Sequence, residues 1–193
     1  MTPFEQQLTA VRACKICAQF LEPRPMLQIA PSAQILIAGQ APGKKVHTSG
    51  ILFNDASGER LRDWLGVTAT TFYNPKQFAI LPMGFCYPGS GKSGDLAPRP
   101  ECAQTWRAPL LADLAQLQLT LIIGRYALAY HLPQAPQSIT EAVKAWRTNG
   151  PKVMVLPHPS PRNNPWLKQN PWFTTEVLPE LRQRVAALIS VKT

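Results

Sequence analysis

Short apolar runs alternate along this chain with longer stretches in which apolar residues recur at helical spacing. Four of the runs have the length of a buried strand, and they lie within 32–43, 78–83, 119–124 and 152–160. The other pattern predicts helices over 57–66 (with Ser57 as its N-cap), 101–118, 124–132, 138–146 and 174–190, the last kinked at Pro179. Because strands alternate with helices, we predict an α/β fold. Its three α/β/α layers would enclose a central, largely parallel four-stranded sheet.

The chain length and the apolar pattern bound its organisation. A chain of 193 residues predicts one domain over 1–193, large enough to build its own core. No apolar stretch approaches the ~18 residues of a transmembrane helix, and the first residues contain no apolar signal core. We therefore expect a cytoplasmic, bacterial-type protein, monomeric and without a membrane partner.

The charge balance points to a polyanionic partner. Twenty Lys and Arg against eleven Asp and Glu give a formal net charge of +9. Such an excess favours nucleic acid or an anionic membrane surface. The alternative is a soluble protein that simply has a high isoelectric point, since the basic residues are spread along the chain.

Four cysteines form two pairs. Cys14 and Cys17 are spaced C-x2-C, and fifteen residues separate Cys86 from Cys102. A thioredoxin-like dithiol should follow a strand, and none precedes Cys14. Unrelated buried thiols are a second possibility. Four converging thiolates would suit zinc or an iron–sulfur cluster, and the spacing does not choose between the two.

Two loops follow predicted strands at the carboxyl edge of the sheet, where open parallel sheets bind ligands. The first is GQAPG (39–43), which could also be an ordinary tight turn. The second is HPSPRN (158–163), in which prolines restrict His158, a candidate general acid or hydrogen-bond donor to a developing anion. Ser160 and Arg162 could contact phosphate. Lys168 lies among aromatic residues that could stack on bases or pack the C-terminal helix.

These residues together resemble the uracil-DNA glycosylase superfamily, and most closely its iron–sulfur branch, family 4. Gly39–Gly43 resemble that branch's first motif, GEAPG, and His158-Pro159 begin the second motif, in a form like that of the single-strand-selective branch. The cysteine spacing also matches, so the resemblance implies a 4Fe-4S cluster held by Cys14, Cys17, Cys86 and Cys102. It implies that Phe53 stacks on a base flipped out of DNA.

Several positions depart from the family pattern. Gln40 replaces the acid of GEAPG, Lys44–His47 replace an acidic run, Pro82 replaces a base-reading Asn, and Asp55 replaces a Gly. We therefore assign His158 to the leaving base and Gln40 to water positioning, with Asp55 or His47 as contenders for the missing acid. The remaining residues expected to bind the base are Gly39, Ala41, Gly43 and Asn163. Ser160, Arg162 and Lys168 are expected to bind DNA.

The resemblance implies a monofunctional DNA repair glycosylase that hydrolyses the N-glycosidic bond of a flipped damaged base, with uracil the leading candidate. Its partner would be DNA containing that base, and the protein would be associated with the nucleoid when bound. Hypoxanthine and xanthine are alternative bases. A DNA-binding module that has lost catalysis is a second hypothesis, which the missing acid and Pro82 favour. A zinc-bound structural protein is a third.

Overall fold

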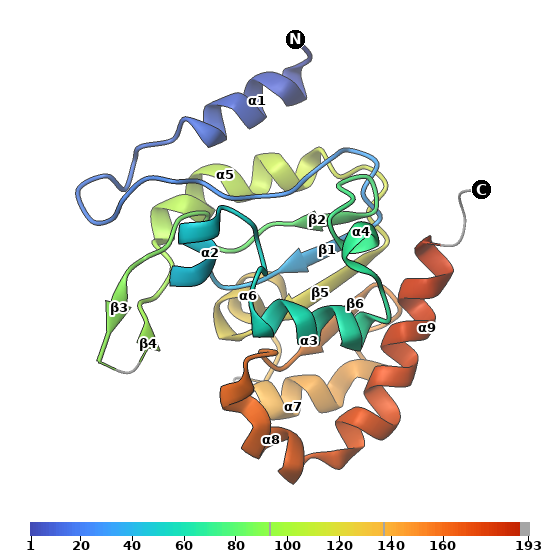
Figure 1. Cartoon of the computed structure of the whole chain (residues 1–193). Helices are drawn as coiled ribbons and strands as arrows, with labels where there is room; N and C mark the ends of the chain where they lie inside the picture. Colours follow the sequence, from blue (N-terminus) through green and yellow to red (C-terminus); the bar gives the residue numbers. More distant parts are fainter. Residues whose placement is uncertain (93, 137, 190–193) are drawn as a thin grey trace.

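Four parallel strands form the centre of the molecule. In the computed structural model, which describes residues 1–92, 94–136 and 138–189, the sheet has the order β2-β1-β5-β6. Its strands are β1 (Ile35–Ala38), β2 (Phe78–Ile80), β5 (Leu119–Ile123) and β6 (Val153–Leu156). A separate antiparallel hairpin joins β3 (Ser90–Gly91) to β4 (Gly94–Asp95). Figure 1 shows this hairpin projecting from one side of the molecule.

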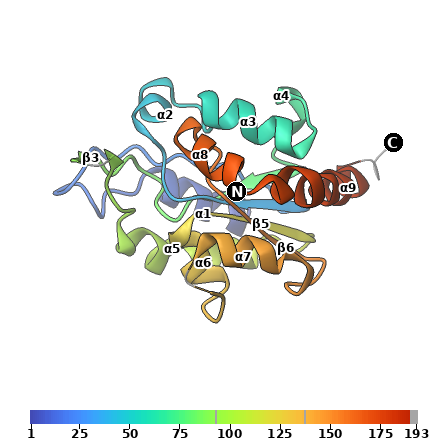
Figure 2. The same ribbon diagram turned by 90° about the horizontal axis from the view of Figure 1, so that it is seen from below.

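Helices cover both faces of the sheet. Figure 2 shows α2 (Lys44–Ser49), α3 (Ala56–Leu65) and α4 (Ala69–Phe72) on one face, and α5 (Pro100–Ala112), α6 (Arg125–His131) and α7 (Ile139–Lys144) on the other. The remaining helical elements are α1 (Pro3–Arg12), η1 (Ala145–Arg147), η2 (Pro161–Asn163), α8 (Asn164–Gln169), η3 (Phe173–Val177) and α9 (Leu178–Ile189). The predicted α/β fold with a four-stranded parallel sheet is confirmed.

The core explains why the strands are continuous apolar runs. All four residues of β1 and all three of β2 are buried, and β5 and β6 are buried over most of their length. A parallel sheet covered on both faces leaves no side of its strands in water, so the alternation of a half-exposed strand is absent from them. Polar chemistry in such a sheet is confined to the loops at its ends.

The helix boundaries differ from the predictions where capping decides them. Asp55, and not Ser57, is the N-cap of α3, and its carboxylate accepts a hydrogen bond from the Gly58 N–H (2.9 Å). The helix predicted over 101–118 ends at Ala112. The C-terminal helix begins as the π-helical turn η3 and continues as α9. Pro179 lacks an N–H for the regular ladder, which accounts for the irregular turn before it. The predicted end at residue 190 lies outside the described residues.

A buried guanidinium joins α5 to the end of β2. The Arg107 side chain is 1% exposed and donates from Nη1 to the carbonyls of Leu81 (2.9 Å) and Pro82 (3.2 Å). It also donates to His131 Nε2 from Nε (3.1 Å), while Nη2 lies 2.6 Å from the same atom. Burial, and then the charge of Arg107, lowers the pKa of His131 to about 3. His131 is therefore neutral and free to accept these bonds.

We predict that His131 makes folding sensitive to acid. The unfolded imidazole protonates below about pH 6.5, whereas the folded one resists protonation until about pH 3. Its stabilising contribution is complete above pH 6.5 and is lost as the pH falls through this window, at about 1.4 kcal/mol per pH unit. His131→Gln retains an acceptor that does not titrate. Urea unfolding between pH 7 and 4 should show a shallower decline for this variant, and parallel curves would contradict the assignment.

Candidate active site

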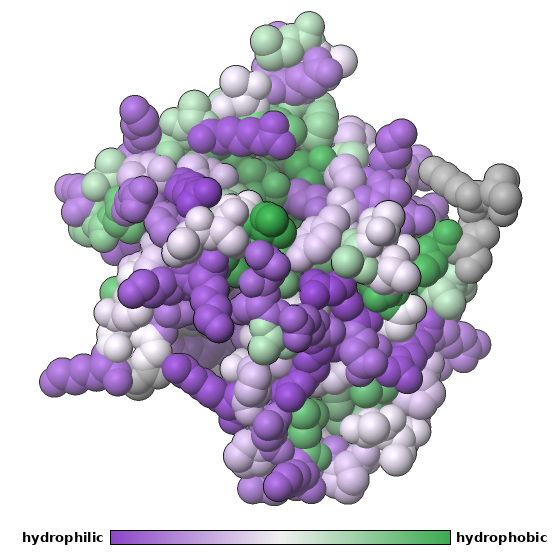
Figure 3. Space-filling model, viewed as in Figure 1, coloured by the Kyte–Doolittle hydropathy of each residue, from purple (hydrophilic) through white to green (hydrophobic). Residues whose placement is uncertain are grey.

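A cavity of about 650 Å³ opens at the carboxyl edge of the sheet. Ile80 and Ile123, at the ends of β2 and β5, line it together with the GQAPG loop after β1 and the HPSPRN loop after β6. Figure 3 shows a hollow on the hairpin side of the molecule, bordered mainly by hydrophilic side chains. The two loops singled out from the sequence therefore face one common space.

Phe53 is held in this cavity by a strained backbone. Its φ of 54° lies in the left-handed region, and no other non-glycine residue among those described has a positive φ. The Arg62 guanidinium donates to the Phe53 carbonyl (3.3 Å), and the ring packs edge-on against Phe72 at a centroid distance of 5.9 Å. A Cβ added to Gly39 would lie 3.9 Å from the tip of the Phe53 ring. The ring thus lies beside the GQAPG backbone, where a base could stack on it.

His158 is fixed as a hydrogen-bond donor to the cavity. The Ser160 N–H donates to His158 Nδ1 (3.1 Å), which places the ring proton on Nε2. Asn163 Nδ2 donates to the His158 carbonyl (2.7 Å), and the Arg60 guanidinium donates to that of Ser160 (3.2 Å). Burial lowers the pKa of His158, although the carboxylates of Asp55 and Asp95 oppose the shift. The His158 imidazole is therefore neutral and still donates from Nε2.

Three polar groups around the cavity could act on a water molecule. Gln40 Nε2 makes a long hydrogen bond to the Leu96 carbonyl (3.5 Å), while Asp55 is already engaged as the N-cap of α3. Asp95, from β4, also lines the cavity and was missed by the sequence analysis. The Gly-rich stretch 89–94 is a hairpin signal that would have placed it, had the segment been interpreted as more than a spacer between two cysteines.

The sequence also matches a known protein family. The sequence profile of the uracil DNA glycosylase superfamily matches residues 27–182. The chain belongs to this superfamily. Membership implies glycosylase-type chemistry on a DNA substrate, while the match does not distinguish the branches. It begins after Cys14 and Cys17, so it leaves the first cysteine pair outside. Among the described residues, no helix has the length and apolarity that a membrane span requires.

Within this superfamily member, the structure gathers most of the predicted site residues around the cavity. Those that line it are Gly39, Gln40, Ala41, Gly43, Phe53, Asp55, His158, Ser160, Arg162 and Asn163. Lys45, which carried no assigned role, lines it as well. Pro82 occupies the wall where the family resemblance leads one to expect an amide, and so offers no donor there.

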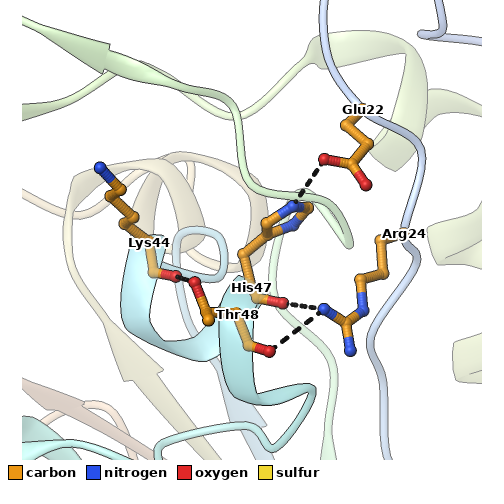
Figure 4. Close-up of polar contacts among 5 residues, drawn as sticks. All are labelled: Glu22, Arg24, Lys44, His47 and Thr48. Atoms are coloured by element: carbon orange, nitrogen blue, oxygen red, sulfur yellow. Dashed lines mark hydrogen bonds and ion pairs between the residues drawn. The ribbon is translucent and has the colours of Figure 1, made fainter.

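His47 and Lys168 do not line the cavity. Figure 4 shows the His47 ring pointing toward Glu22, with Nε2 3.1 Å from the carboxylate. Arg24 donates to the carbonyls of His47 and Thr48 and so caps the end of α2. His47 therefore helps to dock the N-terminal segment. Lys168 is exposed on α8.

The aromatic residues near Lys168 pack the C-terminal elements together. Trp166 lies 5.8 Å from Trp172 and 5.6 Å from Phe173 between ring centroids, and its Nε1 donates to the Thr140 hydroxyl (2.8 Å). Phe173 in turn packs on Trp64 of α3. These contacts favour the packing interpretation of the aromatics over stacking on DNA.

The four cysteines meet at a second pocket. Cys14 and Cys17 come from the segment after α1, Cys86 from the loop after β2, and Cys102 from the first turn of α5. No disulfide joins them. The described part of the chain has no group of three or more His, Cys, Asp or Glu side chains that could hold a metal ion. The cysteines thus share a pocket without forming a ready-made site for one ion.

Each of these sulfur atoms has a hydrogen-bond donor beside it. Trp106 Nε1 donates to Cys14 and the Phe85 N–H to Cys102, both at 3.3 Å. The Arg99 side chain donates to Cys17, and the Arg24 N–H to Cys86. Burial nevertheless raises the pKa of Cys17 and Cys86, and raises that of Cys102 to about 12. The surroundings suit thiolates only if a cation compensates for burial and mutual repulsion.

Gly58, which packs against the Phe53 backbone, and Gly43, which lines the cavity, should differ sharply in their tolerance of a methyl group. A Cβ at Gly58 would lie 1.7 Å from the Phe53 carbonyl oxygen, so Gly58→Ala must displace the strained Phe53 backbone. A Cβ at Gly43 would meet only the carboxylate tip of Asp95, at 3.2 Å. Thermal unfolding should show a loss of at least about 3 kcal/mol for Gly58→Ala and about 1 kcal/mol or less for Gly43→Ala. Equal melting temperatures would refute the proposed support of Phe53.

Proposed function

We propose that the protein is a monofunctional DNA glycosylase that hydrolyses the N-glycosidic bond of a damaged base flipped out of DNA, with uracil as the first candidate base. The observation that carries the proposal is the pairing, in one cavity, of an aromatic ring with a neutral imidazole donor. Phe53 would stack on the flipped base, and His158 Nε2 would donate to the carbonyl oxygen on which charge develops as the base leaves.

The surroundings of the cavity support a DNA substrate. The exposed Arg162 and Lys168 follow His158 in the chain, and the net charge is +9. Such cations neutralise phosphates and make binding depend on salt. The cost of flipping is a few kcal/mol and is smallest for a mispaired or single-stranded base. A neutral imidazole is the better donor here, since protonation would lose the Nδ1 acceptor that fixes the ring.

A second candidate is a DNA-binding protein of the same fold that has lost catalysis. The presence of Gln40 and Pro82 at the cavity, where the resemblance leads one to expect an acid and an Asn, favours it. An assay with oligonucleotides containing uracil, hypoxanthine, xanthine or mismatched thymine, followed by alkali, separates the two functions. Because Lys45 lines the cavity, borohydride should be added in parallel. Borohydride would trap a Schiff base between Lys45 and the sugar. Hydrolysis by water predicts strand breaks after alkali and no such covalent complex.

We predict that His158→Ala slows base release by about 100- to 1000-fold, because it removes one preorganised donor. The melting temperature and the DNA affinity should stay close to those of the wild type. Arg147→Ala is a matched control, since Arg147 is exposed and its ion pair with Glu176 (3.0 Å) lies outside the cavity. Wild-type rates for His158→Ala on a substrate that the wild type cuts would refute the assignment.

We also propose that Cys14, Cys17, Cys86 and Cys102 hold a 4Fe-4S cluster. Their shared pocket and the donor beside each sulfur support the proposal. A single zinc ion, with Zn–S bonds of about 2.3 Å, needs its four sulfur atoms close together, whereas a four-iron cluster holds them further apart. The spacing of the two cysteine pairs resembles that of the iron–sulfur branch, and this resemblance favours the cluster over zinc.

Replacing any one of these cysteines by Ala should lower the iron content and the yield of folded protein together. Purification without chelators, followed by iron, sulfide and zinc analysis and a visible spectrum, measures both. Lys15→Ala, an exposed position in the same turn, is the control and should retain the wild-type iron content. Full iron in all four cysteine variants, or stoichiometric zinc in place of iron in the wild type, would contradict the proposal.

A further inference from the structure

The β3–β4 hairpin forms a wall of the cavity. The Gln40 amide reaches the Leu96 carbonyl just beyond β4 (3.5 Å). A Cβ added at Gly94 would lie 2.9 Å from Arg162 Nη1, so the hairpin backbone also touches the HPSPRN loop. The Leu96 N–H donates to the Gly89 carbonyl (2.8 Å) and closes the base of the hairpin. The hairpin thus bridges the two loops that carry Gln40 and His158.

The hairpin brings one carboxylate to the first of these loops. Asp95 lines the cavity, and a Cβ on Gly43 would lie 3.2 Å from its Oδ2. Within residues 1–92, 94–136 and 138–189, no hydrogen bond or ion pair engages this carboxylate. The Asp55 carboxylate, by contrast, is committed to the N-cap of α3. Of the two acids at the cavity, Asp95 is the one free to bind a water molecule.

We infer that Asp95 is a catalytic residue that activates the attacking water, in place of the acid absent at position 40. The inference rests on the proposed function. Gln40 would orient the same water through its amide, which can donate or accept a hydrogen bond but cannot take up a proton. The Asp95 charge also bears on His158, where it opposes the effect of burial on the pKa of the imidazole. Both acids therefore lie within electrostatic range of the donor to the leaving base.

The step balances as a hydrolysis. The water oxygen forms a bond to the sugar C1′ while the bond from C1′ to the base nitrogen breaks, and its electron pair leaves with the base. One water proton passes to the Asp95 carboxylate, and the other remains on the new C1′ hydroxyl. The base leaves as an anion whose oxygen accepts the hydrogen bond from His158 Nε2. Asp95 then returns its proton to solvent or to the departed base.

Single-turnover base release from saturating uracil-containing DNA tests the inference. Asp95→Asn preserves the shape of the side chain but cannot act as a general base, so it should slow release of uracil by at least about 100-fold. DNA affinity and melting temperature should not change. Asp55→Asn should cost much less, because Asn also caps helices well. Asp63→Asn, an exposed acid on α3 whose carboxylate is 3.7 Å from Arg182, is the control for loss of charge alone. Formate should speed Asp95→Ala and not His158→Ala.

Three results would overturn the inference. If Asp95→Asn matches the wild type while Asp55→Asn is slow, Asp55 activates the water. If formate leaves Asp95→Ala unchanged, the carboxylate serves only to pack the hairpin. Both results leave the proposed glycosylase function intact. If the wild type releases none of the four bases under the same conditions, the proposed function fails and the inference falls with it.

Discussion

The cavity depends on one constraint, namely that four parallel strands end at the same edge of a single buried sheet. Both faces of the sheet are covered by helices, so the strands are apolar and offer no place for polar chemistry along their length. The loops after β1 and β6 must emerge at this edge, with the end of β5 between them. Gln40 and His158 therefore line one cavity, together with Ile123 at the end of β5.

The part of the site that follows from this constraint could be predicted from the sequence. Apolar runs identify buried strands, and parallel strands bring the GQAPG and HPSPRN loops to one edge whatever their details. Asp95 could not be predicted in this way, because its position depends on β3 and β4, two strands of two residues each, pairing beside the first loop. The sequence also did not predict that Asp55, and not Ser57, is the N-cap of α3. Both residue types cap helices, and only the path of the backbone decides between them. His47 was misplaced because α2 orients it toward Glu22.

Charges of both signs surround the neutral imidazole of His158 in the cavity. The chain carries a net +9, and the cavity is lined by two acidic side chains and a neutral imidazole as well as by Lys45 and Arg162. At His158, burial lowers the pKa and the two carboxylates raise it, and burial prevails. Stronger coupling to the acids would protonate Nδ1 and break the bond from Ser160 that sets the tautomer. The exposed cations can thus attract the DNA backbone while the cavity keeps a neutral donor for the leaving base.

The cysteine pocket and the cavity are linked through one segment of chain. Cys86 and Cys102 bracket the β3–β4 hairpin, and the Phe85 N–H donates to the Cys102 sulfur. A shared cluster would close this loop of about fifteen residues at its base. For a disulfide, closing a loop of that length is worth about 3 kcal/mol of chain entropy. The gain would fall on the segment that carries Asp95, whose carboxylate makes no hydrogen bond or ion pair with the residues that the structure describes. A cluster with no part in electron transfer could therefore still act on the reaction, by fixing both ends of the hairpin that positions the carboxylate.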